Sequence, residues 1–542
     1  MIIEANIVDI RNRRIDFGKV GMQGGRIVSV QRTGQERDTA SYILPGLIDA
    51  HVHIESSMLV PSEFARMAVP HGTVATVSDP HEIANVLGVA GVEYMLDNAA
   101  LTPFKFFFGA PSCVPATHFE TAGATIDSLA ILGLLERDDI WYLAEMMNYP
   151  GVLTDDPEVL AKIRHAHQLG KPVDGHAPGV VGDAAVRYIR AGISTDHECV
   201  SYEEAAFKLE QGMKIIIREG SAARNFDALH PLISQFPSMV MLCSDDKHPD
   251  DLAIGHINAL VRRALQEGCG LFDVLQAACI NPVEHYEIPV GTLQPGDPAD
   301  FIEVKDMESL EIIQTVIDGK VVFDREGVRL PAIPVQVENK FAASPRSASD
   351  FALEVPSGQL RVIGAIDGAL VTEERVLDAT TVTEEDADIL KIAVINRYED
   401  VPAAVAYIQG FGLQTGAIAS SVAHDSHNIV AVGRHDADLA AVVNAVIEAR
   451  GGIAAIGGGE EHVLPLPVAG LMSDQDGRQV AAAYTAIDRF VKETLGSTLA
   501  APFMTLSFMA LLVIPRLKLS DKGLFDGMNF HFVPVAVTEQ LS

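Results

Sequence analysis

The chain has 542 residues, 48% hydrophobic and 21% charged, and is too long for a single ordinary hydrophobic core. Its 73 acidic and 40 basic residues give a formal net charge of −33, which argues against nucleic acid or an anionic membrane surface as a partner. No window holds about 20 uninterrupted apolar residues, and no cationic segment precedes an apolar stretch at the start, so we expect a cytoplasmic protein without membrane spans.

Residues 1–46 and 286–335 are rich in β-like runs that are broken by glycine and proline turns. The stretches GGRIVSVQ (24–31) and GTLQPGDPADFIEV (291–304) are typical of them. Neither segment is long enough to form a hydrophobic core alone. We therefore expect the two segments to pair into one small β-sandwich beside the next unit.

Between these segments, residues 47–285 alternate short apolar runs with amphipathic helical stretches, the pattern of a parallel sheet with crossover helices. The runs are LIDAHVH (47–53), TVATVSD (73–79), FKFFFGAP (104–111), WYLAEMM (141–147), PVDGH (172–176), ISTDH (193–197), KIIIRE (214–219) and VMLCSD (240–245). Eight strands, each followed by a helix-forming segment, predict an α/β fold with a (β/α)8 TIM-like barrel.

The stretch RLPAIPVQVENKFAASPRSASD (329–350) is a connector rich in proline, serine and alanine. A further unit, residues 345–542, begins near the end of this connector and returns to mixed strand and helix patterns. We therefore expect an additional C-terminal α/β (α+β) domain, which includes the polar turn SVAHDSHN (421–428).

Two histidines end the first run of the predicted barrel, in the sequence ILPGLIDAHVHIESSM (43–58). In an extended strand His51 and His53 share one face, whereas Val52 and Ile54 share the other, apolar face. The imidazoles lie about 7 Å apart along the strand, from two residues at roughly 3.3 Å rise, close enough to bind one metal ion. The alternative is that two histidines stand near a strand end by chance, and the other strands decide between these interpretations.

Polar side chains also end the other strands, and in a (β/α)8 barrel these ends meet at one rim. The residues at or just beyond the strand ends are His51, His53, Asp79, His81, Glu82, Glu145, His176, His197, Arg218, Glu219, Asp245 and Asp246. Mixed imidazole and carboxylate ligands suit Zn²⁺, Mn²⁺ or Fe²⁺. No lysine lies between residues 120 and 160 to serve as a carboxylated bridge between two ions, so Glu145 is the candidate bridge.

The histidine pair after an apolar strand, the later single histidines and the terminal aspartate resemble the amidohydrolase superfamily. Six stretches further resemble the adenine deaminase family within it: HVHIESSM, DPHEIANV, LAEMMNYPGV, IREGSAARN, SDDKHPDDL and SVAHDSHNIV. The resemblance covers essentially the whole chain, including the C-terminal domain. Ala177 in GHAPG and Asn258 in GHIN depart from the family pattern, and neither is an expected ligand.

The resemblance implies the hydrolysis of adenine to hypoxanthine and ammonia, in purine salvage or catabolism, with two divalent metal ions. Mn²⁺ or Fe²⁺ is expected, with Zn²⁺ as an alternative. The implied ligands are His51, His53 and Asp245 for one ion, His176 and His197 for the other, and Glu145 as the bridge. Two such ions can lower the pKa of a water from about 15.7 to near 7 and so supply hydroxide at neutral pH. Asp245 can also accept the hydroxide proton and pass it toward the leaving amine.

Three polar residues after the second strand are candidates for handling substrate protons. Glu82 could protonate a ring nitrogen if burial raises its pKa, and Asp79 or His81 could steer that proton or the amino group. The alternative for Asp79 is a structural role as the cap of the following helix.

Four further residues are candidates for substrate binding. Arg218 and Ser221 could contact the purine, with loop anchoring as the alternative. In the C-terminal domain, Asp425 and His427 belong to the turn 421–428, which could reach over the barrel mouth of its own or a neighbouring subunit and exclude water. A solvated turn is the alternative there.

Two other functions stand as alternatives. A hydrolase that acts on a related aminopurine or a cyclic amide would share the superfamily pattern, although a cyclic-amide hydrolase would more naturally carry a lysine bridge. A catalytically inactive barrel that serves as a binding scaffold would have lost a metal ligand, and here every ligand position is filled. We also expect a homo-oligomer, a dimer or higher, with adenine as the small-molecule partner.

Overall fold

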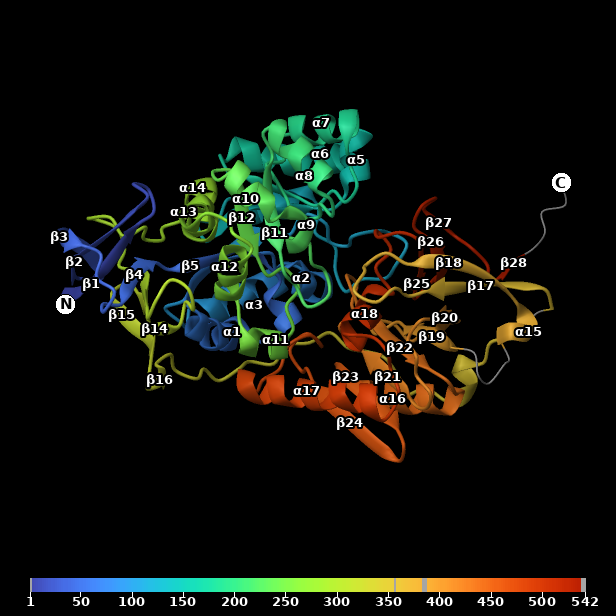
Figure 1. Cartoon of the computed structure of the whole chain (residues 1–542). Helices are drawn as coiled ribbons and strands as arrows, with labels where there is room; N and C mark the ends of the chain where they lie inside the picture. The colour runs from blue at the N-terminus through green and yellow to red at the C-terminus, as the bar shows by residue number, and fades with distance from the viewer. Residues whose placement is uncertain (1, 355–356, 383–387, 538–542) are drawn as a thin grey trace.

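The computed structural model describes residues 2–354, 357–382 and 388–537. Three parts lie side by side in Figure 1: a flanking β-sheet, a central barrel and a C-terminal sheet-rich domain. The predicted outer units begin at residue 1 and end at residue 542, and these two end positions lie outside the described residues. No helix in the described part of the chain is both long enough and apolar enough to cross a membrane.

Eight parallel strands build the barrel in the order of the sequence. They are β5 (Leu47–Val52), β6 (Thr73–Ser78), β7 (Lys105–Ala110), β8 (Ile140–Met146), β9 (Val173–Gly175), β10 (Thr195–Asp196), β11 (Lys214–Arg218) and β12 (Val240–Cys243). Strands β5 to β9 form one sheet and β10 to β12 another. The Ser194 N–H donates to Val173 O (2.9 Å) between the two sheets, and the Asp245 N–H donates to His51 O (3.0 Å) where the barrel closes. The predicted (β/α)8 class is confirmed.

Helices cover the outside of these strands, so that β5 and β6 are buried along their whole length. They are α1 (Pro61–Ala68), α2 (His81–Leu87), α3 (Val89–Ala99), α4 (Ser128–Leu135), α5 (Tyr149–Leu153), α6 (Pro157–Gln168), α7 (Gly182–Arg190), α8 (Tyr202–Glu210), α9 (Phe226–Leu229), α10 (Pro231–Gln235), α11 (Pro249–Ile254), α12 (Ile257–Gln266), α13 (Leu271–Leu275) and α14 (Asn281–Tyr286). Local sequence sets where several of them begin. Asp156 caps α6 by accepting the N–H groups of Glu158 and Val159, and Ser201 caps α8 by accepting that of Glu204.

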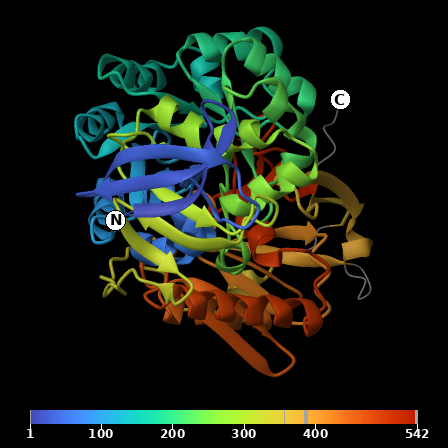
Figure 2. The ribbon, with the colours of Figure 1, turned by 60° about the vertical axis from the view of Figure 1, so that its left-hand side comes forward.

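The two flanking segments form a single eight-stranded sheet, which lies in the foreground of Figure 2. Its strands, in spatial order, are β16 (Gly327–Val328), β15 (Lys320–Asp324), β14 (Ile312–Ile317), β13 (Phe301–Val304), β4 (Tyr42–Pro45), β1 (Ile2–Asp9), β2 (Arg14–Gln23) and β3 (Arg26–Gln35). Strand β4 joins the two segments, because it pairs with β1 on one side and with β13 on the other. One residue separates β4 from β5, so this sheet anchors the first strand of the barrel.

The C-terminal domain is built on a nine-stranded sheet. Its strands are β18 (Glu373–Asp378), β17 (Gln359–Gly364), β20 (Ala404–Gln409), β19 (Ile389–Ile395), β22 (Ile429–Gly433), β21 (Ala417–Ser420), β23 (Gly452–Gly457) and β24 (Glu460–Pro465), with β28 (Ala536–Val537) beside β17. A small sheet contains β25 (Leu517–Ser520), β26 (Gly523–Asp526) and β27 (His531–Phe532), and the helices are α15 (Ala379–Val382), α16 (Asp436–Glu448), α17 (Gly477–Glu493) and α18 (Pro502–Phe508). Helix α16 buries its apolar face against β21, β22 and β23.

Helix α17 runs along the barrel side of this domain and packs against α1 and α11 (Figure 1). The Gly477 N–H donates to Glu63 Oε2 (3.2 Å), and a Cβ at Gly477 would come within 2.7 Å of Met67 Cγ. A second contact lies at the other end of the interface, where Asn428 Nδ2 donates to Thr121 O (2.9 Å). The turn 421–428 is therefore held against the barrel.

Candidate active site

Three of the predicted ligands meet where the barrel closes. The Nε2 atoms of His51 and His53 lie 3.2 Å apart, and both side chains are buried. Asp245 lies two residues beyond β12 and has a left-handed backbone conformation, with φ 54°. Its Oδ1 atom lies 3.6 Å from His51 Nε2 and 3.3 Å from His53 Nε2. Strand pairing between β5 and β12 thus assembles two nitrogens and one oxygen in one place.

Glu145, near the end of β8, lies between two pairs of histidines. Its Oε1 atom is 3.2 Å from His53 Nε2. Its Oε2 atom is 2.7 Å from His176 Nδ1 and 3.2 Å from His197 Nε2. One carboxylate thus faces both predicted metal positions, one oxygen toward each, which is the arrangement that a bridging ligand requires.

Both acidic residues of this cluster are held in the ionised form. Burial alone would raise the pKa of Glu145, but His176 beside it, together with further histidine contacts, keeps that pKa well below its usual range. Burial would likewise raise the pKa of Asp245, but the Arg218 guanidinium and the neighbouring histidines keep it well below its usual range.

The donor set fits divalent cations. The residues described around the site provide six carboxyl groups and one guanidinium: Glu82, Glu145, Glu198, Asp245, Asp246 and Asp425 against Arg218. Buried negative charge is costly unless positive charge compensates it. The ligand atoms are imidazole nitrogens and carboxylate oxygens, which suit Zn²⁺, Mn²⁺ and Fe²⁺. Five histidines and four carboxylates lie close enough to share metal ions in overlapping groups: His51, His53, His81, His176, His197, Asp79, Glu145, Glu198 and Asp245.

Arg218, at the end of β11, is occupied by two carboxylates. Both of its terminal nitrogens donate to Glu198, one of them over 2.9 Å, and Nη1 also donates to Asp245 Oδ2 (2.7 Å). The residue lines the cavity and fixes the second oxygen of Asp245. Sequence reasoning missed Glu198, although the signal was present, because it directly follows His197 after β10.

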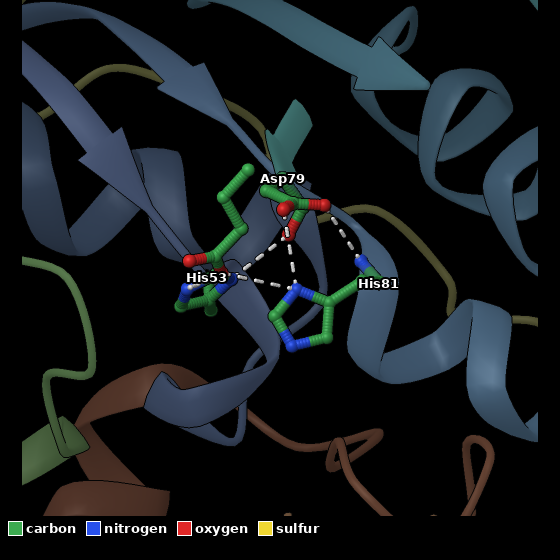
Figure 3. A group of neighbouring side chains, drawn as sticks. His53, Asp79 and His81 are labelled. Atoms are coloured by element: carbon green, nitrogen blue, oxygen red, sulfur yellow. Dashed lines mark hydrogen bonds and ion pairs between the residues drawn. The ribbon is translucent and has the colours of Figure 1, made fainter. Parts of the chain in front are cut away.

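Asp79 and His81 lie beside His53, at the point where β6 leads into α2 (Figure 3). Asp79 Oδ1 accepts the backbone N–H of His81 (3.1 Å), the first residue of α2, although Pro80 occupies the N-cap position of that helix. The Asp79 backbone oxygen also contacts His53 Nδ1 (3.1 Å), which orients that ring. His81 Nε2 points toward the C-terminal domain and lies 3.8 Å from Asp425 Oδ1.

Glu82 is enclosed by two histidines of the C-terminal domain. His424 Nδ1 lies 2.6 Å from Glu82 Oε1, and His427 Nε2 contacts Glu82 Oε2. A role of Glu82 as an acid was conditional on burial raising its pKa, but the two imidazoles outweigh burial and hold this pKa well below its usual range. The cause is that positive or hydrogen-donating groups beside a carboxyl favour its ionised form.

The remaining walls of the site line a small cavity. Its apolar part consists of Met147 from the barrel and Leu370, Phe508 and Leu511 from the C-terminal domain. Sequence reasoning missed these four because nothing in a short apolar stretch tells a cavity wall from ordinary core. Ser221 is not among the lining residues; its hydroxyl donates to Asp251 Oδ2 (2.6 Å) and accepts the His248 N–H (2.9 Å), so it anchors its loop.

Comparisons with known proteins cover both the barrel and the C-terminal domain. The amidohydrolase family matches residues 42–322, and the adenine deaminase C-terminal domain matches residues 366–531. A protein of Sulfurovum sp. (strain NBC37-1) named adenine deaminase is 57% identical over 98% of this chain and 99% of its own length. Proteins of the same name from Salinibacter ruber and Methanosarcina mazei are 56% and 50% identical, again over 98% of this chain and 98% and 99% of their own lengths. The chain therefore belongs to the adenine deaminases of the amidohydrolase family.

Proposed function

We propose that this protein hydrolyses adenine to hypoxanthine and ammonia at the carboxyl end of its barrel, with two divalent metal ions. The observation that carries the proposal is the extent of the similarity to proteins named adenine deaminase. It spans the strand-end ligands and the C-terminal turn that closes on them. Adenine is a planar aromatic ring with polar edges, which suits a site that combines apolar wall residues such as Phe508 and Leu511 with polar side chains.

In this proposal His51, His53 and Asp245 hold one ion, and His176 and His197 hold the other. Glu145 bridges the two, which is supported by the separate direction of its two oxygens. When bound, such ions supply a water of lowered pKa as the nucleophile for C6 of the purine. We propose Mn²⁺ or Fe²⁺ as the native ions, since the donor set of nitrogen and oxygen atoms suits both.

The attacking water provides both protons that the reaction needs. One proton must reach a ring nitrogen, and the other must reach the amino group so that it leaves as ammonia. Asp245 takes one proton and delivers it to the amine, which is supported by its position between His53 and Arg218. Glu82 carries the other to the ring nitrogen. Because Glu82 is ionised at rest, it acts as a carrier that receives the proton before passing it on.

Arg218 acts mainly on Asp245 in this scheme. Its two terminal nitrogens are occupied by Glu198 and Asp245, so neither of them is free to contact the purine. Asp425 and His81 are held less tightly than Arg218, because His81 Nε2 and Asp425 Oδ1 lie 3.8 Å apart in the cavity wall. We assign them to recognition of the polar edge of the purine.

The test is turnover of a panel of aminopurines by metal-replete protein, followed by ultraviolet absorbance and by release of ammonia. Adenine should be converted with equal amounts of hypoxanthine and ammonia. Turnover of another aminopurine at a higher kcat/KM would redirect the substrate assignment, and hydrolysis of a cyclic amide without ammonia release would overturn the proposal. The expected homo-oligomer stays a prediction, which light scattering on the purified protein tests.

A further inference from the structure

The turn from Ala423 to Asn428 brings two imidazoles to one carboxylate on the opposite domain. His424 Nδ1 and His427 Nε2 each face a different oxygen of Glu82. All three side chains are at most 3% exposed, so solvent does not compete for these contacts. A carboxylate that is approached from both oxygens cannot rotate about its last bond without losing both partners.

The hydrogen bonds of His427 determine which of its nitrogens carries the proton. Its Nδ1 atom accepts the backbone N–H of Ala423 (3.3 Å), and an accepting ring nitrogen has no hydrogen of its own. Burial, the largest influence, also lowers the pKa of His427 and favours the neutral ring. A neutral ring without a proton on Nδ1 carries it on Nε2, the atom that contacts Glu82.

The turn is held firmly enough to place these rings. Asn428 accepts the Arg397 N–H (3.1 Å) with its side-chain oxygen and donates to Thr121 O (2.9 Å) with its side-chain nitrogen. Tyr398 Oη donates to Ser426 O (2.7 Å). The ring of His424 stacks on the wall residue Phe508, with centroids 4.6 Å apart and planes 14° apart.

We propose that His424 and His427 are positioning residues of the deamination reaction, with which the C-terminal domain orients Glu82 as the proton carrier. His427 acts as a fixed neutral donor from Nε2 to Glu82 Oε2, and His424 supports Oε1. The inference rests on the proposed function of the site. It gives the C-terminal domain a direct part in catalysis, beyond covering the barrel mouth.

The contacts of His424 and His427 with the two oxygens of Glu82 form a clamp, which also explains how an ionised carboxylate can deliver a proton. Donors on both oxygens stabilise the charged form, so a proton that Glu82 receives makes it a strong acid. Such a group releases the proton to the ring nitrogen readily instead of keeping it. Without the histidines the buried carboxyl would hold its proton more tightly and could also turn away from the purine.

The experiment compares His427→Ala and His427→Gln with the control His462→Gln. His462 lies on β24, has a partly exposed side chain, pairs with Glu460 and is not among the residues that line the site. Because a displacement of about 1 Å in a catalytic group can cost 10²-fold, we expect kcat of His427→Ala to fall about 10²-fold. Metal content and KM should change little. His427→Gln, whose amide can still donate, should recover about tenfold, and His462→Gln should match the unaltered protein.

Several results would overturn the inference. One is His427→Ala with kcat within threefold of the unaltered protein and full metal content. Another is a parallel loss of activity and of bound metal, which would make the histidines metal ligands. Equal loss in the alanine and glutamine variants would remove the donor role. If the unaltered, metal-replete protein does not deaminate adenine at all, the proposed function fails instead, so the two failures are distinguishable.

A measurement on the unaltered protein keeps the inference testable if the variants do not fold, since His427 has φ 53° and sits in a tight turn. Nitrogen NMR of protein with ¹⁵N-labelled histidine distinguishes the two neutral tautomers and the charged ring. We expect His427 to be neutral at pH 7 with its proton on Nε2. A proton on Nδ1, or a doubly protonated ring, would contradict the proposed clamp.

Discussion

Asp245 and Asp246 are neighbours in the chain, but their carboxyl groups have different partners. Asp245 lies 3.3 Å from His53 Nε2 and accepts Arg218 Nη1 (2.7 Å), whereas Asp246 Oδ1 accepts the hydroxyl of Ser56 (2.5 Å). The left-handed backbone of Asp245 turns the two side chains apart. Asp245 approaches the proposed ligands His51 and His53, whereas Asp246 lies beside Glu82 and His424, so the two residues should respond differently to the same substitution.

Asp245→Asn should keep much of its metal while kcat falls by about 10² to 10⁴, the usual contribution of a positioned general base. The amide retains one oxygen as a ligand but cannot carry the proton. Asp246→Asn should be tolerated far better, because a serine hydroxyl can hydrogen-bond an amide as well. Steady-state rates of the two metal-replete variants, together with metal analysis of each, measure this difference. A larger loss in Asp246→Asn would assign the proton transfer to Asp246.

Replacing the bridge should remove metal first and activity as a consequence. In Glu145→Gln an uncharged amide, a poor ligand, replaces the carboxylate whose two oxygens face His53 and His176. We expect about one equivalent of metal to be lost, and with it most of the activity. Elemental analysis after dialysis measures this. The bridge assignment is wrong if the variant keeps both ions and a near-normal kcat.

Reconstitution of metal-free protein should require two equivalents of metal per chain. The reason is the presence of two histidine pairs on opposite sides of Glu145, each with its own carboxylate oxygen. Titration with Mn²⁺ or Fe²⁺, with activity followed at each addition, checks the number. Full activity at one equivalent would contradict a binuclear site.

Glu82→Gln should differ from Glu145→Gln in its metal content. Glu82 faces His424 and His427 of the C-terminal domain and lies outside the six proposed ligands. We therefore expect full metal binding with a kcat lowered by about 10² to 10⁴, because an amide cannot carry a proton. Loss of metal in this variant would mean that Glu82 is itself a ligand.

Lys518 supports the part of the cavity wall that the C-terminal domain provides, and it should make the free energy of unfolding depend on pH. Its buried Nζ donates to Leu370 O (2.7 Å) and Phe508 O (2.9 Å), the backbone of two wall residues. Burial lowers its pKa from 10.5 to about 7. Between these values the unfolded chain binds the proton and the folded chain does not, so stability should rise with pH across the interval, with a slope of at most about 1.4 kcal/mol per pH unit.

The matched variant is Lys518→Met, which keeps the length of the side chain but cannot titrate. Its free energy of unfolding by urea should lack this part of the slope between pH 7 and pH 10.5. Its KM for adenine should rise, because the backbone of Leu370 and Phe508 loses its support. Identical slopes for the two proteins would show that the lysine is charged in the folded state throughout.

The barrel and its strand-end cluster follow from local sequence. Buried parallel strands must be short and apolar, and their carboxyl ends meet at one rim, so eight runs with polar ends imply both the fold and the place of the site. A period of two placed His51 and His53 on one face of the first strand, and the polar ends of the other strands made them candidate ligands. The direction in which the pKa of Glu82 shifts could not be predicted from the sequence, because it depends on two imidazole rings from a distant part of the chain.

What only the tertiary structure decided is the way the two domains meet. The contacts of Glu82 with His424 and His427, and the apolar wall that Leu370, Phe508 and Leu511 add to the site, join segments that lie far apart in the sequence. Local periodicity records which face of an element is buried, and it carries no information about which distant side chain covers that face. The sequence by itself therefore determined the barrel and its strand-end residues. Packing of the C-terminal domain against the rim determined which groups hold Glu82 and close the cavity, because such contacts exist only once both domains are folded together.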